Sequence, residues 1–493
     1  MRLLRSGLPG LALLATVAAG AHAQGVVVQG SSWAQYLEMR PLLADSVAFA
    51  STDSATSITR RTAAGVLTTC VAGDAYCYFY RSAPRAALTA MMQDLDVTAW
   101  GLGQGLSVHA QLRGRDAVGD GRNLWPQATQ TFSVLSAYVE LDRPTVSAKL
   151  GRQWEQSGLG MFNFDGLSAS VSPLAQIRVN AYVGQTLVQG LNEPLDAAAL
   201  APVENLPPID KSYLFGSTVQ FRPSPYASVQ VQYQREVRSD FGAVNSERMA
   251  ANAAFRAPFG SFGFDATRDM ATETFNDLAA HVVFLPVDGI TPGVAFHHYV
   301  PYFDLWTIWG AFSPVGYDEA TATLNWAAAD QRLAFGLSGG RREYEDTYTG
   351  VISLPLSSSG WRAGATGSVR PFTHWAIEGS YNMDINFGAS SSDGDARLRW
   401  TPSDRGSLAV YGTAFQNIYE FTVGQGRVLG AGFQGTVRLS SDLNLIADAA
   451  LYHQTRQDDP QQTNWDQRRV SVRLEWRVGA NPGGWTVGPV KKP

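Results

Sequence analysis

The 493-residue chain has little charge, little lysine and almost no cysteine. Only 16% of its residues are charged, and lysine occurs only at positions 149, 211, 491 and 492. The basic residues are therefore nearly all arginines, and they are spread singly along the chain. Because a nucleic-acid-binding surface needs clustered basic residues, we expect no nucleic-acid partner.

Long apolar runs are also missing after the first two dozen residues. The longest ones, such as Val282–Val287, are far shorter than the roughly 20 residues that a membrane-spanning helix needs. No stretch keeps a helical periodicity of 3.6 residues, so the sequence does not predict a helical protein.

Residues 1–23 have the pattern of a secretory signal peptide. Arg2 and Arg5 precede a short apolar stretch, and Ala21-His22-Ala23 provides the small residues of a cleavage site. We therefore expect an exported chain whose mature part begins at Gln24.

Cys70 and Cys77 are the only cysteines. In an oxidising compartment, two cysteines this close in sequence are expected to form a disulfide that closes a small loop. They offer too few ligands for a metal site. No Cys-x-x-Cys-His motif is present, so no haem is expected to attach covalently, and we expect no other cofactor.

From about residue 88 to residue 478, the sequence repeats an alternating stretch of roughly 10–14 residues followed by a turn or loop. In the last stretch, the apolar positions are Val470, Val472, Leu474, Trp476 and Val478, and the polar ones are Arg469, Ser471, Arg473, Glu475 and Arg477. Such alternation describes a strand with one apolar and one polar face. Strands this long, with polar faces inward, are typical of a transmembrane β-barrel.

Short and long connections alternate along the chain. Pro223-Ser224-Pro225 is a short one and Gln189–Lys211 a long one, as in barrels with short periplasmic turns and long outer loops. The count predicts an all-β, antiparallel up-and-down barrel of about 22 strands, within a range of roughly 18–22.

The count of strands after residue 88 is odd, so one more strand is expected upstream. We place it within Ser46–Thr69, which puts the two cysteines in the first outer loop. The expected organisation is then a signal peptide (1–23), a short periplasmic segment (24–45), the barrel (46–478) and a C-terminal tail (479–493).

A barrel of this width needs something inside it. Residues 24–45 are too few for a plug domain. Either loops such as Gln189–Lys211 and Glu345–Gly360 fold inward, or another protein occupies the lumen.

Two short motifs were weighed for catalysis and metal binding. Gly336–Gly340 matches the G-x-S-x-G nucleophile elbow, which requires a strand–turn–helix context. Here it lies within an alternating stretch, so we expect a plain strand and no enzyme. His297 and His298 are neighbours on one strand and point to opposite faces, so they cannot share a metal ion.

Ten charged residues are expected on the polar faces of the strands and therefore in the lumen: Arg362, Arg370, Glu378, Asp384, Arg397, Arg399, Arg438, Arg473, Glu475 and Arg477. The spacing of the strands predicts that Arg362, Asp384 and Arg397 are close neighbours. These charges form either cross-strand ion pairs on a solvated wall or a constriction that selects ions.

The signal peptide, the ladder of hairpins and the missing plug resemble those of Gram-negative outer-membrane porins. Leu150-Gly151-Arg152-Gln153 and Phe164-Asp165-Gly166-Leu167 resemble a pattern of alginate-export-like porins and of the porins in porin–cytochrome conduits. The resemblance implies an outer-membrane channel, in contact with lipid, that passes small hydrophilic solutes, and anions if arginines outnumber acids locally. The alternative it implies is a sheath around a multihaem cytochrome.

Overall fold

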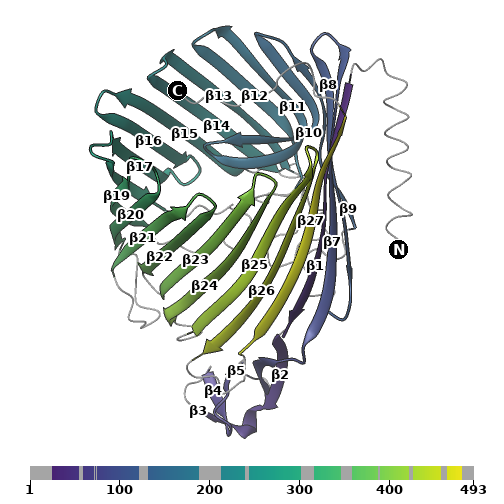
Figure 1. Cartoon of the computed structure of the whole chain (residues 1–493), viewed down its shortest axis with the longest axis vertical. Coiled ribbons are helices and arrows are strands. Elements are labelled where there is room, and N and C mark those ends of the chain that lie inside the picture. Colours follow the sequence, from purple (N-terminus) through teal and green to yellow (C-terminus); the bar gives the residue numbers. More distant parts are fainter. Residues whose placement is uncertain are drawn as a thin grey trace.

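The computed structural model describes residues 25–40, 42–54, 59–70, 73, 75–121, 131–187, 212–238, 244–300, 316–345, 358–386, 389–420, 426–456 and 464–479. These residues form a closed antiparallel sheet of 22 strands and a separate sheet of five short strands (Figure 1). Consecutive strands pair from β7 to β27, and β1 pairs with both β7 and β27, which closes the barrel. The predicted fold class and strand number are confirmed.

The barrel strands are β1 (Gly25–Met39), β7 (Ala86–Gly103), β8 (Leu106–Val118), β9 (Phe132–Asp142), β10 (Val146–Ser157), β11 (Gly160–Leu174), β12 (Ile177–Thr186), β13 (Ser212–Ser224), β14 (Ala227–Arg238), β15 (Val244–Ala257), β16 (Gly260–Asp269), β17 (Thr274–Phe284), β18 (Ile290–Tyr299), β19 (Tyr317–Ala327), β20 (Leu333–Tyr344), β21 (Ser359–Phe372), β22 (Trp375–Ile385), β23 (Ala389–Ser403), β24 (Gly406–Glu420), β25 (Gly426–Ser440), β26 (Leu443–Arg456) and β27 (Asp466–Gly479).

The outer face of the barrel is apolar, as the alternation predicts. Ile377 and Tyr381 of β22 and Val472 of β27 are each more than 40% exposed, because they point away from the lumen. Near the short turns, the rings of Trp375 and Trp400 stack across neighbouring strands. An apolar band with aromatic residues near its edge is what a lipid-facing surface requires.

The first strand lies upstream of its predicted place. β1 pairs with β27 from Val27 opposite Gly479 to Glu38 opposite Arg468. The prediction that the first strand lies within Ser46–Thr69 is therefore wrong, and so is the prediction that residues 24–45 precede the barrel. Its alternation is weak because small residues stand where apolar ones are expected. At Gly30, for example, an added Cβ would lie 2.3 Å from the ring of Trp476.

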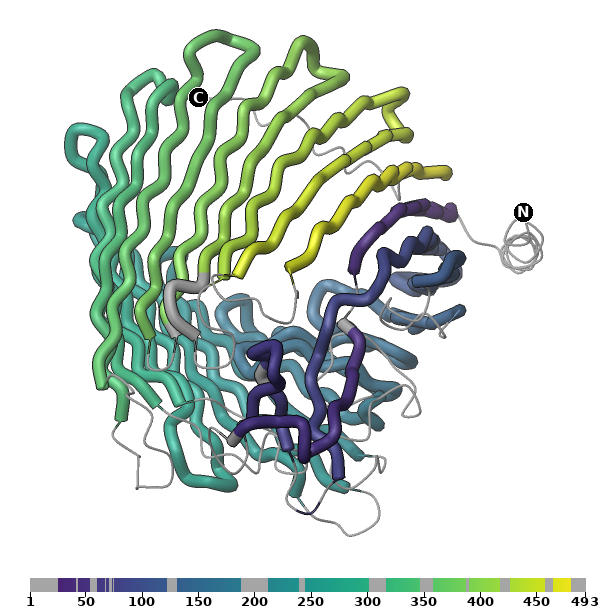
Figure 2. Tube along the Cα trace, turned by 90° about the horizontal axis from the view of Figure 1, so that it is seen from below, coloured from purple at the N-terminus to yellow at the C-terminus, as the bar shows by residue number. Residues whose placement is uncertain are grey.

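The segment between β1 and β7 forms the second sheet instead. Its elements are β2 (Leu42–Ala48), η1 (Phe49–Ser51), β3 (Thr52–Ser54), β4 (Thr59–Thr62), β5 (Leu67–Cys70) and β6 (Tyr76–Ser82), with strand order β2-β6-β5-β4-β3. It lies at the end of the barrel opposite the short turns, and in Figure 2 it is seen in front of part of the opening.

The predicted disulfide is present in this small sheet. Cys70 and Cys77 face each other on β5 and β6 and are joined by a bond of 2.03 Å. Both residues are buried, at 4% and 0% exposure. The cysteines lie in the connection between β1 and β7, at the end of the barrel away from the short turns.

Three predictions from the sequence concern residues outside the described ranges. These are the signal peptide, the tail after residue 479, and the loops expected to fold into the lumen. Separately, the described part of the chain has no helix long and apolar enough to cross a membrane.

Candidate functional site: the lumen and its inward hairpin

The hairpin of β10 and β11 leaves the barrel wall and enters the lumen (Figure 1). β10 pairs with β9 only from Ser147 to Arg152, and β11 pairs with β12 only as far as Phe164. Residues 153–163 therefore form the tip of the hairpin. Within the described chain, the strands of this tip pair with each other and not with the barrel wall. Among the described residues, this β-hairpin narrows the lumen.

A row of three glycines marks the bend. Gly151 lies opposite Gly166, and Gly166 lies opposite Gly184 on the next strand. Gly151 has a φ of 132°, and an added Cβ there would lie 2.3 Å from the carbonyl oxygen of Ala137. Only glycine permits this conformation and this close backbone approach.

Directly beside the glycines, Arg152 and Asp165 form a two-pronged ion pair across the hairpin. The Arg152 Nε and Nη2 atoms each donate to an Asp165 carboxylate oxygen at 2.9 Å. Arg152 Nη1 also donates to the carbonyl oxygen of Val134 on β9, at 3.0 Å. The two stretches that resemble porin sequences thus build the root of the inward hairpin.

The hairpin tip packs on the inner face of strands β12 to β15. Phe164 joins Tyr182 and Leu214 in a buried apolar cluster, and its ring lies 5.7 Å from that of Tyr182. The Arg248 guanidinium of β15 lies 5.7 Å from the centre of the Phe162 ring. Burying a side chain the size of Phe164 contributes about 1.5–3 kcal/mol, so this cluster anchors the tip.

Polar contacts fix the tip as well. The backbone N–H of Gly158, in the turn, donates to the side-chain oxygen of Gln232 on β14 at 2.7 Å. In the wall beneath the tip, Tyr182 of β12 donates its hydroxyl to Gln234 of β14 at 2.9 Å. Both glutamines are almost fully buried, so their contacts cannot be exchanged for water. The Gly158 bond therefore joins the apolar cluster in anchoring the hairpin to the wall.

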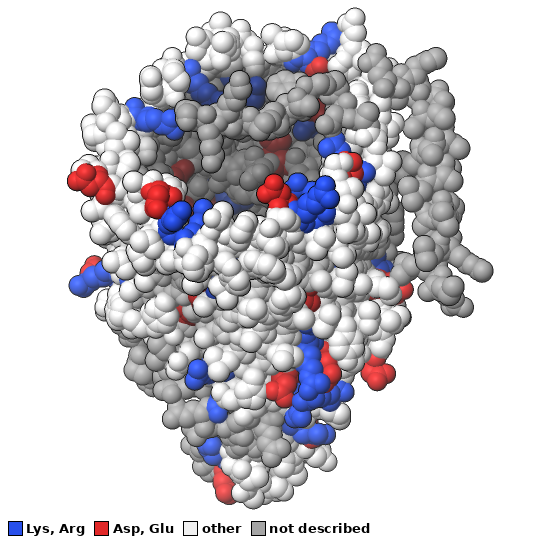
Figure 3. All heavy atoms as spheres, in the orientation of Figure 1, with Lys and Arg blue, Asp and Glu red and all other residues white. Residues whose placement is uncertain are grey.

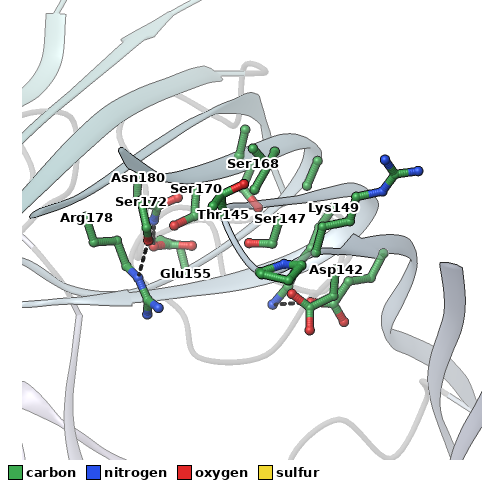
Figure 4. Close-up of a pocket in the computed structure, with 16 residues that line it drawn as sticks. Asp142, Thr145, Ser147, Lys149, Glu155, Ser168, Ser170, Ser172, Arg178 and Asn180 are labelled. Carbon is green, nitrogen blue, oxygen red and sulfur yellow. Dashed lines mark hydrogen bonds and ion pairs between the residues drawn. The ribbon is translucent and has the colours of Figure 1, made fainter. Parts of the chain in front are cut away.

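At the foot of the hairpin lies a cavity of about 670 Å³ (Figure 4). The Asn180 amide donates to Glu155 at 2.5 Å, and Arg178 Nε donates to the hydroxyl of Ser172 at 3.5 Å. The cavity is also lined by Ser147, Ser168, Ser170, Lys149, Glu140 and Asp142. Hydroxyl and charged groups of both signs suit a hydrated polar solute.

A buried ionic network lies on strands β19 to β22. Arg342 Nε donates to Glu319 at 2.5 Å, and both side chains are no more than 10% exposed. Arg362 lies 3.3 Å from Asp384 and 3.4 Å from Glu319. The predicted proximity of Arg362 and Asp384 is confirmed. Glu319 and Arg342 escaped the sequence analysis, because only the register shows that they face Arg362.

Arg397 is not part of this network, so its predicted closeness to Asp384 is wrong. β23 begins at Ala389, which shortens the connection and places Ser391 opposite Asp384. Arg397 instead lies opposite Glu378 and has its guanidinium 5.7 Å from the ring centre of Tyr411.

The other predicted residues occupy the polar faces of their strands. Arg399 pairs with Glu378 at 2.8 Å, and Arg473 pairs with Glu475 at 3.1 Å. Arg370, Arg438 and Arg477 lie beside the short turns, away from the ion pairs. Their role in selecting ions stays a prediction.

The two motifs behave as plain strand residues. Gly336–Gly340 lies within β20, and no helix follows it there. His297 contacts Asp277 at 3.3 Å, while His298 contacts Asp318 at 2.8 Å on the opposite face of the wall. Among the residues that the structure covers, no group of three or more acidic, histidine or cysteine residues could hold a metal ion.

No family model matches the chain, and no curated protein matches it either. Among solved structures, a BenF-like porin from Pseudomonas fluorescens Pf-5 has 10% identity and a TM-score of 0.39, over 92% of this chain and 99% of that one. OccAB1 from Acinetobacter baumannii has 10% identity and a TM-score of 0.40, over 93% and 99%. A mutant ferric enterobactin receptor from Pseudomonas aeruginosa has 9% identity and a TM-score of 0.47, over 93% and 81%.

At these TM-scores and identities, none of the similarities identifies a function. They do not confirm the resemblance to alginate-export-like porins or to the porins of porin–cytochrome conduits.

Proposed function

We propose that this chain is an outer-membrane channel through which small hydrophilic solutes pass passively. The observation that carries the proposal is a wall that is apolar outside and polar inside, narrowed by an inward hairpin. A 22-stranded barrel is otherwise wide enough to need a plug. The β10–β11 tip reduces the passage from one side and leaves a polar cavity beside it.

A modest preference for anions is proposed from one arginine of the lumen, Arg397. Arg362 and Arg399 are neutralised by acidic partners, whereas Arg397 has only the face of Tyr411 and a strand neighbour whose carboxylate is bonded to Arg399. Unneutralised charge along a narrow aqueous passage biases which ion enters. The bias is expected to be modest because most lumen arginines are paired.

The sheath around a multihaem cytochrome has no support from the comparisons. The anchored hairpin also takes up space that a protein in the lumen would occupy. A channel therefore fits the described residues better.

The test is the single-channel conductance of the purified barrel in a planar bilayer. A variant lacking residues 154–163, with the paired residues Gln153 and Phe164 joined by an Asn-Gly turn, should conduct more than the native protein. Ser368→Ala, a small change on the opposite wall, serves as the control. A native barrel that conducts nothing, or a deletion that leaves conductance unchanged, would contradict the channel or the constriction respectively.

Ion preference is measured by the reversal potential under a salt gradient. Arg397→Ala should shift it toward cation preference, and Arg362→Ala plus Arg397→Ala should shift it further. An unchanged reversal potential in both variants would remove the anion preference but not the channel.

A further inference from the structure

The ten short turns of the barrel share one backbone contact. In each, a residue of a neighbouring strand donates its N–H to a carbonyl oxygen of the turn. The ten donors are Asp142, Ser172, Arg222, Arg256, Leu285, Ala327, Arg370, Thr401, Arg438 and Arg477. Five of these ten equivalent positions are arginines, although Lys and Arg together make up only 38 of the 493 residues.

All five arginines lie on the lumen side of the wall. Each directly follows an apolar residue of the outward face, such as Phe255 before Arg256 and Val437 before Arg438. Phe255 is 48% exposed and Val437 is 42% exposed toward the outside. Because successive strand residues point to opposite faces, the arginines point inward.

These side chains differ from the arginines deeper in the lumen. Arg362 and Arg399 have acidic partners within 3.5 Å. Among the described residues, none of the five rim arginines has a side-chain ion pair or hydrogen bond with another described residue, and none belongs to those with further partners. Four are exposed, and Arg477 is half-buried. Their charges are therefore available to a ligand.

Figure 3 shows the mouth at the short turns as a hollow with basic and acidic side chains around its edge. The five arginines stand on β13, β15, β21, β25 and β27, and neighbours around the closed wall are two to eight strands apart. At about 4.8 Å per strand, neighbours in the ring are roughly 10–40 Å apart along the wall. A single small monovalent anion cannot touch two of them, but an anion with several charges can.

We infer that this arginine ring binds multivalent anions at the short-turn mouth and gathers anions there for passage. The inference rests on the proposed channel and adds a binding site and a direction to it. The closest neighbours in the ring, Arg222 with Arg256 and Arg438 with Arg477, are the two places where one extended polyanion bridges two guanidinium groups.

Because the five arginines stand at the short-turn mouth, their charge should make the conductance depend on polarity. When the voltage drives anions in through the ring, cations arriving from the opposite mouth are held back, so both ions accumulate in the lumen and the current rises. The reverse polarity depletes the lumen. Screening decides the size of the effect, since the Debye length is about 30 Å at 0.01 M salt and about 3 Å at 1 M.

The experiment records single channels at low and high salt, with tripolyphosphate added to one compartment at a time. The native channel should rectify at low salt and lose this asymmetry at 1 M. Tripolyphosphate should reduce the current from one compartment only, and that compartment must be the one from which anions enter at the high-conductance polarity. This agreement holds for either direction of insertion into the bilayer.

Two variants test the ring itself. Replacing the five arginines together (R222Q, R256Q, R370Q, R438Q, R477Q) should abolish both the rectification and the one-sided block. Thr401→Arg adds a charge at an equivalent position and should increase both. Rectification that persists in the fivefold variant, or a block that is equal from both sides, would overturn the inference.

A binding measurement separates this inference from the channel itself. Calorimetric titration of the detergent-solubilised barrel with tripolyphosphate should show an affinity that falls on the order of tenfold as salt rises. At low salt, the fivefold variant should bind tripolyphosphate more weakly than the native barrel. Binding without conductance would refute the channel and keep the site. Equal binding by native and fivefold variant would refute the site.

Discussion

Gly151 and Gly166 lie opposite each other at the point where the β10–β11 hairpin leaves the barrel wall. Gly151 has a φ of 132°, which side chains rarely permit. An added Cβ at Gly166 would lie 2.1 Å from the carbonyl oxygen of Val183. The direction of the hairpin, and with it the width of the passage, therefore depends on two residues without side chains.

Gly151→Val should destabilise the barrel and displace the hairpin. Holding a non-glycine residue in such a conformation costs on the order of 1–3 kcal/mol, and the side chain would also collide with β9. The expected result is a lower unfolding temperature in detergent together with a higher single-channel conductance. Gly339→Val is the matched control, because an added Cβ at that strand glycine has nothing within 4 Å. Equal effects of the two changes would show that Gly151 is not the hinge.

The disulfide should stabilise the small sheet without affecting the barrel. Joining Cys70 to Cys77 closes a loop of about eight residues, which in the chain-entropy model contributes about 2–3 kcal/mol. Replacing both cysteines by serine should therefore make the segment from β2 to β6 sensitive to protease. The difference in gel mobility between the unheated and the heated barrel should stay unchanged. Mass spectrometry of unreduced native protein should show the two peptides linked. Two freely alkylated thiols would contradict this.

The two faces of β22 should respond differently to an added charge. Ile377 and Tyr381 are 48% and 51% exposed on the outer face, where arginine costs about 2–4 kcal/mol near the middle of the bilayer. Ser380 faces the lumen and donates to Asp395 at 2.5 Å, so Ser380→Arg gains a nearby carboxylate and should cost much less. Denaturant unfolding in lipid vesicles measures the difference. Equal costs on the two faces would mean that this strand does not face lipid as assigned.

Regular strands could be predicted from the sequence because the polarity of each residue indicates which face of the wall its side chain occupies. β22 and β27 alternate along their whole lengths, and their faces and pairing follow from that pattern. β1 does not alternate clearly, since Gly30 and Ser32 stand where apolar residues are expected. Its place became visible only through its pairing with β27.

Features that depend on several strands at once could not be predicted. Gly151, Gly166 and Gly184 form a hinge only because the register aligns them. Of the five rim arginines, alternation alone identifies Arg370, Arg438 and Arg477 as lumen residues. Arg222 and Arg256 share their position through an equivalent backbone hydrogen bond, which no pattern within a single strand reveals.

The buried pair of Glu319 and Arg342 should contribute far more to stability than the exposed pair of Glu378 and Arg399. Glu319→Gln leaves the Arg342 guanidinium buried without its closest carboxylate, which for buried pairs costs about 3–5 kcal/mol. The cost should fall at the lower end of that range, because Asn386 and Asp384 still contact Arg342 at 2.5 Å and 3.5 Å.

Glu378→Gln is the control, because its partner Arg399 is 38% exposed at the side chain and such pairs contribute about 0–1 kcal/mol. Replacing both members of the buried pair, with Glu319→Gln and Arg342→Gln, should recover part of the loss, because no buried charge is then left without its partner. Denaturant unfolding of the four proteins, native included, measures these differences. If Glu319→Gln and Glu378→Gln cost the same, the ionic network on β19 to β22 lies in contact with water. Its arginines would then add to the selecting charge of the lumen rather than to the stability of the wall.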